Sequence, residues 1–178
     1  MVVAKNYFEL FGLPVSFDVN LSELKEKYQE LQKAVHPDRF VNASDQEKML
    51  SVQQATSIND AFESLKKPLS RARYLLKLLG VDYDEEKNTI MDTAFLMQQM
   101  ELREELSELK AVSDPYAAIE KIIEEITQNI KLLQQNLRDE FAKDRAADTE
   151  YLADKIRKLQ FFEKLRDEAD AMEADLDD

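Results

Sequence analysis

The amino-acid sequence predicts an all-α protein, and three observations support this prediction. Only two glycines and four prolines occur in 178 residues, and helix interiors disfavour both residue types. Leucine, glutamate, lysine, glutamine and alanine, which favour helices, are plentiful. Apolar residues make up 44% of the chain and recur at spacings of three and four, the period of a helix with one buried face. This length permits one domain or two small domains.

The first part of the chain predicts a short helix followed by a longer one. The stretch NYFELFGLP predicts a helix that ends at Gly12, with Pro14 just beyond it. The next helix begins after Asp18 or Asn20 and must end at Pro37, because proline disfavours the α conformation in the residue before it. The expected buried face of this helix consists of Leu21, Leu24, Tyr28, Leu31 and Val35.

A loop over residues 37–43 leads to a second long helix of similar length. Ser44 and Glu47 have the S-x-x-E pattern of a capping box, which predicts where this helix begins. The helix is expected to reach Pro68. Its predicted buried face consists of Ala55, Ile58, Phe62 and Leu65. The segment LSRARYLLKLL then predicts a further turn or two of helix, ending at Gly80.

The second half of the chain predicts three helices. The first runs from Asp92, as its N-cap, to about Lys110, and the second begins at Pro115, since proline is favoured at the first helical position. The third starts near Asp148. The expected inward-facing residues are Ile119, Ile123, Ile126, Ile130, Leu133 and Leu137 on the second helix and Leu152, Ile156, Leu159, Phe162 and Leu165 on the third. Short connections predict that these helices pack as an antiparallel three-helix bundle.

Charge divides the chain into the same two halves. Residues 1–75 contain ten Lys or Arg and ten Asp or Glu, so residues 76–178 carry the whole net charge of −13. Such an acidic half repels nucleic acids and anionic membranes and favours a basic protein partner. We therefore expect one module at residues 1–76 and a second at residues 91–178. A linker over residues 77–90, which includes VDYDEEKN, is expected to join them.

Composition excludes several classes of protein. No apolar run is long enough to cross a membrane, and the first ten residues lack the apolar core of a signal peptide. The absence of cysteine excludes disulfides and thiolate metal sites and agrees with a reducing cytosol. With two glycines the chain has no glycine-rich phosphate loop, and it has no H-E-x-x-H motif. We expect a cytoplasmic protein without a cofactor or a metal site.

The stretch VHPDRF, residues 35–40, holds the only histidine of the chain. A catalytic His36 would need a nucleophile, an orienting partner or a metal, and the chain offers no second histidine and no cysteine. A lone histidine in the last turn of a helix often does no more than stabilise the helix when charged. Here, however, Pro37 and Asp38 follow it, between two helices of similar length. This context predicts a docking loop.

The segment LSELKEKYQELQKAVHPDRF, with FELFGLP before it and INDAFESL after it, resembles the J-domain of the partners of DnaK-type chaperones. The resemblance implies that His36, Pro37 and Asp38 dock onto the chaperone and stimulate its ATP hydrolysis, so that the chain itself is not an enzyme. Pro37 restricts the loop, and Asp38 offers a carboxylate to an arginine of the partner.

J-domains also present a basic face near this motif. Lys25, Lys33 and Arg39 are the candidates here, although Lys25 and Lys33 also fit an ordinary solvated face. Gln29 and Glu30 stand where general J-proteins usually carry positive residues. There is also no glycine- and phenylalanine-rich segment and no cysteine-rich module. These departures indicate a specialised chaperone partner.

The first helix of the second half carries apolar residues on two sides. At about 100° per residue, its core face is formed by Phe95, Leu102, Leu106 and Leu109. The residues that point away from this face are Leu96, Met97 and Met100, with Glu101, Glu104 and Glu108 along the same side. Phe161 similarly lies off the seam of the last helix. Exposed apolar residues rimmed by carboxylates are typical of a protein-binding patch, but packing against the first module or the linker fits equally well.

The segments DTAFLMQQMELREEL and RKLQFFEKL resemble the C-terminal domain of the HscB family, the co-chaperones of iron–sulfur cluster biogenesis. The likeness covers essentially the whole chain and implies an L-shaped arrangement of two domains. It also implies an HscA-type chaperone and an IscU-type scaffold protein as partners. The implied scaffold contacts are Leu96, Met97, Met100, Glu101, Glu104, Glu108 and Phe161. Met100 and Gln98 stand where relatives often have Leu and Glu, and the Cys-rich segment of human-type relatives is absent, so we expect a bacterial type.

Three other functions stay open from the sequence. The chain is compatible with a J-domain protein for another client, in which the bundle is a generic acidic arm. It is also compatible with a structural helical protein in which HPD is accidental. A metal-dependent hydrolase built on clustered glutamates is the most distant alternative, because helix-face carboxylates at this density are usually solvated. The sequence also leaves self-association open.

Overall fold

The computed structural model of the chain describes residues 6–83 and 92–176. Every regular element in these ranges is a helix, which confirms the predicted all-α class. The chain divides into two compact units, Met1–Gly80 (unit 1) and Val81–Asp178 (unit 2). Half of the predicted linker, from residue 84 to residue 90, lies outside the described residues. No helix in the described ranges combines the length and the apolar character that a membrane crossing needs.

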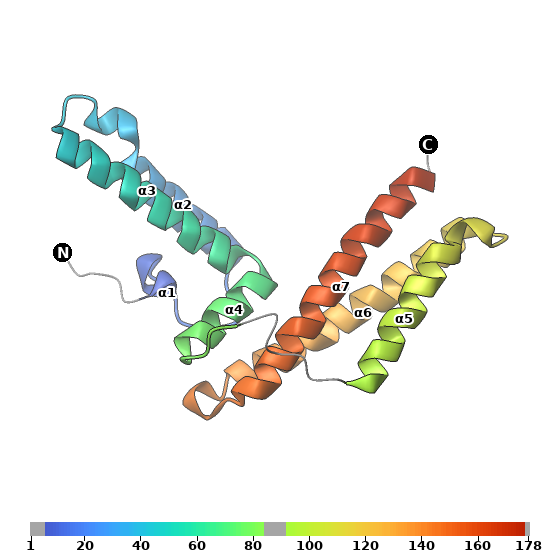
Figure 1. Cartoon of the computed structure of the whole chain (residues 1–178). Coiled ribbons are helices and arrows are strands. Elements are labelled where there is room, and N and C mark those ends of the chain that lie inside the picture. The colour runs from blue at the N-terminus through green and yellow to red at the C-terminus, as the bar shows by residue number, and fades with distance from the viewer. Residues whose placement is uncertain (1–5, 84–91, 177–178) are drawn as a thin grey trace. The chain divides into compact units, whose positions relative to one another are not determined.

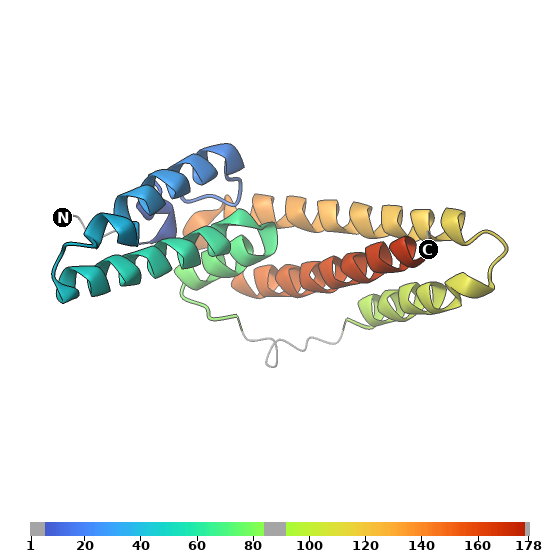
Figure 2. The same cartoon turned by 90° about the horizontal axis from the view of Figure 1, so that it is seen from above.

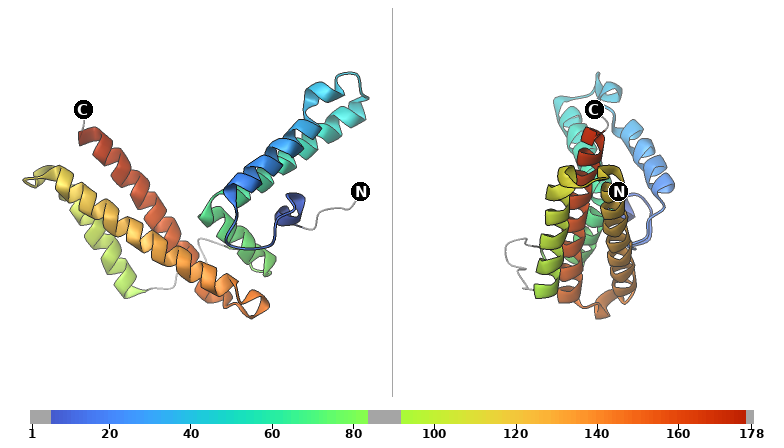
Figure 3. Two further views of the ribbon diagram at one scale, coloured as in Figure 1. Left: turned by 180° about the vertical axis from the view of Figure 1, so that it is seen from behind. Right: turned by 90° about the vertical axis from the view of Figure 1, so that its right-hand side faces the viewer.

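Unit 1 is built on an antiparallel pair of helices, α2 (Leu21–Val35) and α3 (Asp45–Lys66), as Figures 1 and 3 show. The short helices α1 (Tyr7–Leu10) and α4 (Pro68–Leu78) contact α3. A 3₁₀ turn, η1 (Pro37–Phe40), follows α2. The core consists of Phe8, Phe11, Leu13, Phe17, Leu24, Ile58, Ala61, Leu65, Ala72, Leu75 and Leu76. Because α4 ends at Leu78, the first two residues of the predicted linker are helical.

Side-chain caps fix where the helices of unit 1 begin. The Asn20 side chain accepts hydrogen bonds from two backbone amides of the first turn of α2, so Asn20 rather than Asp18 is the N-cap. Ser44 and Glu47 form the predicted capping box: the Ser44 amide donates to Glu47 Oε2 at 2.9 Å, and the Glu47 amide donates to Ser44 Oγ at 3.3 Å. The hydrogen bonds from the Ser44 side chain and backbone lower the pKa of the Glu47 carboxyl.

The buried face of α2 is narrower than the sequence pattern predicts. Leu24 is fully buried, whereas Leu21 is exposed and Tyr28 is half-buried. The reason is that α3 is the main helix packed on α2, so a side chain at the margin of the pair has no second layer above it. Tyr28 makes two contacts with α3. Its ring stacks on that of Phe62, with 4.2 Å between the ring centres, and its hydroxyl donates to Asn59 Oδ1 at 2.9 Å.

A buried arginine connects three segments of unit 1. Arg71 is 5% exposed; its Nε donates to the carbonyl of Leu65 at 2.9 Å, and its Nη1 donates to the carbonyl of Phe17 at 2.5 Å. Burial lowers the pKa of Arg71, and the nearby charge of Asp18 opposes this shift. The guanidinium therefore joins the end of α3, the start of α4 and the loop before α2.

Unit 2 is a bundle of three helices, α5 (Thr93–Glu108), α6 (Pro115–Phe141) and α7 (Thr149–Leu176). Figure 2 shows α6 and α7 as a long antiparallel hairpin, with the shorter α5 alongside. Two 3₁₀ turns, η2 (Leu109–Ala111) and η3 (Asp144–Ala146), lie in the connections. The core consists of Phe95, Leu102, Leu106, Leu109, Ile119, Ile122, Ile126, Leu133, Leu137, Leu152, Ala153, Ile156, Leu159, Phe162, Leu165 and Ala169.

The seam of α6 differs from its prediction at three positions. Ile123 and Ile130 are only half-buried, whereas Ile122, which the predicted seam omits, is buried. At about 100° per residue, Ile122 lies on the flank of α6 that faces α5. The seam is therefore set by two neighbouring helices and is shifted toward α5, whereas the prediction assumed a simple a/d stripe.

A buried carboxylate holds the turn between α6 and α7. Glu140 is 7% exposed and accepts hydrogen bonds from the Asp148 amide at 2.8 Å and from Lys143 Nζ at 2.5 Å. The hydrogen bond from the Asp148 backbone is the main cause of the lowered pKa of Glu140, and the bond from Lys143 adds to it. Asp148 in turn caps the first turn of α7 with its own carboxylate, as its predicted place at the helix start requires.

Candidate functional site

The His36-Pro37-Asp38 motif lies at the end of the α2–α3 pair, where η1 joins the two helices (Figure 1). α2 ends at Val35, and His36 takes the extended conformation, with φ −60° and ψ 131°, that a residue before proline favours. Pro37 is the first residue of η1, and the Arg39 amide donates to the His36 carbonyl at 3.0 Å. The motif is therefore a short, locally hydrogen-bonded turn.

Both polar side chains of the motif are open to solvent. The side chains of His36 and Asp38 are 56% and 86% exposed. His36 Nδ1 accepts a hydrogen bond from the Asp38 amide at 3.3 Å and lies 3.6 Å from the Asp38 carboxylate. Within the described residues, no group of three or more His, Cys, Asp or Glu side chains is arranged to hold a metal ion. This geometry presents a ring and a carboxylate side by side to a partner.

The predicted basic residues near the motif are all exposed. Arg39 Nη1 donates to the carbonyl of Lys33 at 3.3 Å, so η1 and the last turn of α2 are tied together. Lys25 and Lys33 form no ion pair with any residue that the structure describes, whereas Lys27, on the same helix, pairs with Glu30 at 3.2 Å. Lys25 and Lys33 are therefore available to attract an acidic partner.

A groove of about 320 Å³ opens beside the motif, a feature that the sequence analysis missed. Its lining includes Pro37, Asp38, Phe40, Val41, Lys48, Ser51 and Val52. Val41 and Val52 are exposed, and so are their neighbours Met49 and Leu50. The sequence does contain a signal for this groove: Met49, Leu50 and Val52, in the first half of α3, are apolar but do not belong to the predicted buried face of that helix.

The predicted scaffold contacts on α5 form an exposed surface, which together with Phe161 we call the α5 patch (Leu96, Met97, Met100, Glu101, Glu104, Glu108 and Phe161). Leu96, Met97 and Met100 are 42%, 57% and 71% exposed. The core residues that the helical projection predicts on the opposite side of α5 are buried. The three glutamates are exposed on the same helix, so the apolar side chains have an acidic border.

Phe161 occupies a different position from the rest of the α5 patch. It belongs to α7 and is half-buried. Its ring makes edge contacts with Phe95 on α5 at 5.5 Å and with Phe162 at 5.3 Å, and the Arg103 guanidinium lies 5.8 Å from its centre. Phe161 therefore packs between α5 and α7 and remains partly exposed.

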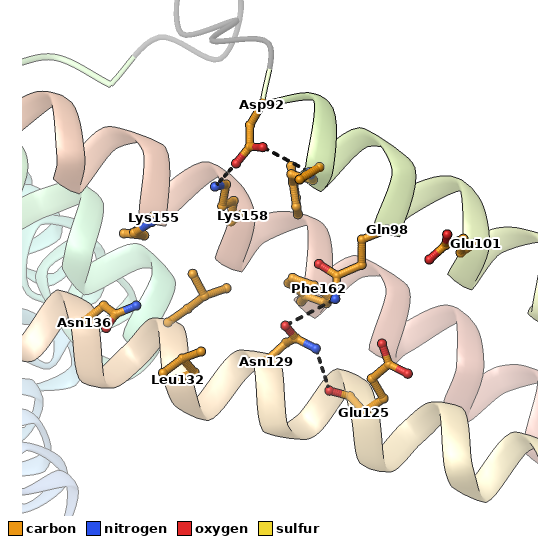
Figure 4. A pocket seen from close by; sticks show the side chains of 13 residues that line it. Asp92, Gln98, Glu101, Glu125, Asn129, Leu132, Asn136, Lys155, Lys158 and Phe162 are labelled. Atoms are coloured by element: carbon orange, nitrogen blue, oxygen red, sulfur yellow. Dashed lines mark hydrogen bonds and ion pairs between the residues drawn. The ribbon is translucent and has the colours of Figure 1, made fainter.

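The start of α5 is anchored on α7 by Asp92, as Figure 4 shows. Asp92 accepts hydrogen bonds from the Phe95 amide at 3.2 Å and from Lys158 Nζ at 2.6 Å. The bond from Lys158 is the main cause of the lowered pKa of Asp92. Burial alone lowers the pKa of Lys158, but its hydrogen bonds to Asp92 and Asp154 raise it above the usual value. These contacts hold the helix that carries the α5 patch.

Comparisons with known proteins agree with this arrangement. The family profile described as the HSCB C-terminal oligomerisation domain matches residues 91–170. The co-chaperone protein HscB homolog of Shewanella amazonensis is 46% identical over 168 residues, which cover 94% of this chain and 97% of that protein. The corresponding protein of Colwellia psychrerythraea is 43% identical over 173 residues, 97% of this chain and 99% of its own.

Two solved structures resemble the whole chain. Chaperone HscB from Vibrio cholerae superimposes with a TM-score of 0.89 at 43% identity, covering 96% of this chain and 99% of that one. The human co-chaperone protein HscB superimposes with a TM-score of 0.85 at 34% identity, covering 94% of this chain and 82% of that one. Sequence and structure comparisons thus both extend over unit 1 and unit 2.

Proposed function

This chain belongs to the HscB family of co-chaperones, and from that premise we propose that it acts in iron–sulfur cluster assembly as an adaptor between a chaperone and a scaffold protein. Unit 1 stimulates ATP hydrolysis by an HscA-type chaperone, and unit 2 binds an IscU-type scaffold. The adaptor works in the cytoplasm and performs no catalysis itself. ATP is hydrolysed by the chaperone, and the cluster is carried by the scaffold, because this chain has no cysteine to ligate iron.

The observation that carries the proposal is the exposed pair of His36 and Asp38, held in a fixed turn by Pro37. A preorganised loop loses little conformational entropy when it docks, so more of its contact energy appears as affinity. The Asp38 carboxylate suits a bidentate contact with an arginine of the chaperone. Lys25 and Lys33 on the neighbouring helix add electrostatic attraction to an acidic chaperone surface.

Each unit contributes one binding step in this mechanism. The α5 patch holds the scaffold through its apolar side chains and acidic border. The His36-Pro37-Asp38 turn then docks onto the chaperone. Once one protein holds both partners, their encounter becomes intramolecular, and a short connection raises the effective concentration to about millimolar. Accelerated ATP hydrolysis traps the scaffold on the chaperone and favours transfer of the cluster to an acceptor protein.

The proposal is tested by the single-turnover ATPase rate of the HscA-type chaperone of the same organism, in the presence of its scaffold. The wild-type adaptor is expected to accelerate hydrolysis, and Asp38→Asn is expected to abolish the acceleration because it removes the docking charge. Asp60→Asn is the matched control, since Asp60 is an exposed carboxylate in the second half of α3, away from the motif. Equal rates with wild type and Asp38→Asn would contradict the proposed role of the motif.

A further inference from the structure

A groove of about 500 Å³ lies between α5 and α6, with side chains of α7 along its floor (Figure 4). Ala94, Gln98 and Glu101 of α5 line it. At about 100° per residue, these residues and Leu96 lie on opposite flanks of the helix. Leu96 therefore points away from the groove, whereas Glu101 belongs to both surfaces.

Part of the groove lining is apolar, and its walls carry amide groups. Phe95, Leu133 and Phe162 form buried parts of the lining, whereas Leu132 is 60% exposed. Gln98 Nε2 donates to Asn129 Oδ1 across the groove at 3.5 Å, and Asn129 Nδ2 donates to the Glu125 carbonyl at 2.9 Å. Asn136 lies seven residues further along α6. Amide side chains both donate and accept hydrogen bonds, which is what the main chain of an extended peptide requires.

The charge of the groove is uneven along its length. At one end, Lys158 pairs with Asp92 and Asp154, and Asp154 also pairs with Lys155 and Arg157. Glu101 and Glu125 also line the groove, and neither forms an ion pair with any residue in the described ranges. Figure 4 shows these two carboxylates on the facing helices α5 and α6. The part of the groove between Glu101 and Glu125 therefore attracts a positively charged group.

We propose that this groove receives a second segment of the scaffold protein, an extended stretch with an apolar side chain next to a lysine or arginine. The inference rests on the proposed function, because it assigns a further contact to the same client. Glu101 belongs both to the α5 patch and to the groove, so a client held on the patch reaches the groove along one side of α5. The apolar side chain contacts Leu132, and the cation lies near Glu101 and Glu125.

Charge also distinguishes this occupant from a second copy of the chain. Residues 76–178, which include all of unit 2, contain fourteen Lys or Arg and twenty-seven Asp or Glu, so a second unit 2 brings further negative charge toward Glu101 and Glu125. Like charges brought together across an interface oppose association. A segment with a lysine or arginine has the complementary charge.

The position of the segment is tested by cross-linking. Because the chain has no cysteine, Leu132→Cys provides a single attachment point for a benzophenone maleimide. Irradiation with the scaffold protein is expected to give a cross-link to one scaffold segment that mass spectrometry shows to contain lysine or arginine beside an apolar residue. Lys131→Cys is the matched control, since Lys131 is exposed and lies outside the groove lining.

The charge of the segment is tested by calorimetric titration with the same scaffold. Glu125→Gln is expected to weaken binding by about three- to tenfold, whereas Glu124→Gln should stay within about twofold of wild type. Glu124 is the adjacent exposed carboxylate and is not part of the groove lining. Circular dichroism of each variant checks that the bundle is folded.

Several outcomes overturn the inference. One is equal cross-linking from Leu132→Cys and Lys131→Cys, and another is cross-linking to a second copy of the chain. Wild-type affinity of Glu125→Gln is a third. Leu96→Ala separates the two proposals: if it weakens binding while Glu125→Gln does not, the groove inference alone fails. If Leu96→Ala, Phe161→Ala and Glu125→Gln all bind as wild type does, the assignment of the scaffold to unit 2 fails as well.

Discussion

Single buried charges hold segments of this protein together at points where helices end. Arg71 links two carbonyl oxygens in unit 1, and Glu140 links the two ends of the α6–α7 turn in unit 2. Each charge is buried with hydrogen-bonding partners, so removing it leaves buried polar groups without a partner. Neither residue belongs to the proposed docking surfaces, so both affect stability and not recognition.

Replacing Arg71 with methionine is expected to destabilise unit 1. The substitution keeps an apolar stem but leaves the carbonyls of Phe17 and Leu65 without these donors, which should lower the free energy of unfolding by about 2–4 kcal/mol. Urea denaturation of the full chain, followed by circular dichroism, measures the effect. Lys67→Met serves as the control because Lys67 is exposed. A similar decrease in the free energy of unfolding in both variants would argue against a stabilising role of the Arg71 hydrogen bonds.

The stability of unit 2 is expected to decrease in acid. The pKa of Glu140 is lower in the folded chain than its usual value of 4.5, so the stabilisation is present above that pH and is lost as the pH falls through the folded pKa. The melting temperature measured at several pH values should therefore fall below about pH 4.5. In Glu140→Gln the melting temperature should be lower at neutral pH and should change less in acid. If the melting temperature of this variant depends on pH as that of the wild type does, Glu140 is not the cause of the acid sensitivity.

At the level of elements, α5 is the helix whose two flanks carry both proposed contacts with the scaffold. Its core side holds Leu102 and Leu106, and its first turn is fixed by Asp92. One flank borders Phe161, whereas the other lines the groove toward α6. The position of α5 on the α6–α7 hairpin therefore determines the shape of both surfaces.

Leu96→Ala and Phe161→Ala are expected to separate binding from stability. Leu96 is exposed, so its truncation should weaken scaffold binding and leave the unfolding transition unchanged. Phe161 packs between α5 and α7, so its truncation should weaken binding and also destabilise unit 2 by about 1–3 kcal/mol. Titration with the scaffold and thermal unfolding measure the two effects. If both variants unfold at the same temperature, the Phe161 contacts contribute little to the stability of unit 2.

At the level of the whole molecule, each unit has its own core and its own docking surface. Unit 1 carries the exposed motif, and unit 2 carries the α5 patch and most of the negative charge. The L-shaped arrangement that the family resemblance implies stays a prediction. Separate cores allow each unit to keep its shape while it binds a different partner.

The charge of unit 2 predicts that scaffold binding depends on salt. The acidic border of the α5 patch and the net charge of −13 should attract a basic surface, and dissolved salt should screen this attraction. Raising the salt concentration from about 0.05 to about 0.5 M should lower the association rate about tenfold and change the dissociation rate much less. Stopped-flow or biosensor kinetics measure both rates. A salt-independent association rate would contradict electrostatic attraction.

The sequence by itself determined the features that depend on neighbours along the chain. The capping box of Ser44 and Glu47, the stop before Pro37 and the cap at Asp92 all involve residues within a few positions of one another. Helical periodicity also separated the buried side of α5 from the exposed side that includes Met100. These predictions succeeded because helix boundaries and faces follow from local hydrogen bonds and from 3.6-residue geometry.

The tertiary structure decided the features that depend on residues far apart in the chain. The hydrogen bond from Arg71 to the Phe17 carbonyl spans 54 residues, and no local pattern indicates it. The exposure of Leu21 and the burial of Ile122 depend on how many helices cover each side. The groove beside Leu132 is lined by residues of α5 and α6 that are far apart in the chain, such as Gln98 and Asn129, which are 31 positions apart. Such contacts arise when helices pack, since packing determines which side chains lose contact with water.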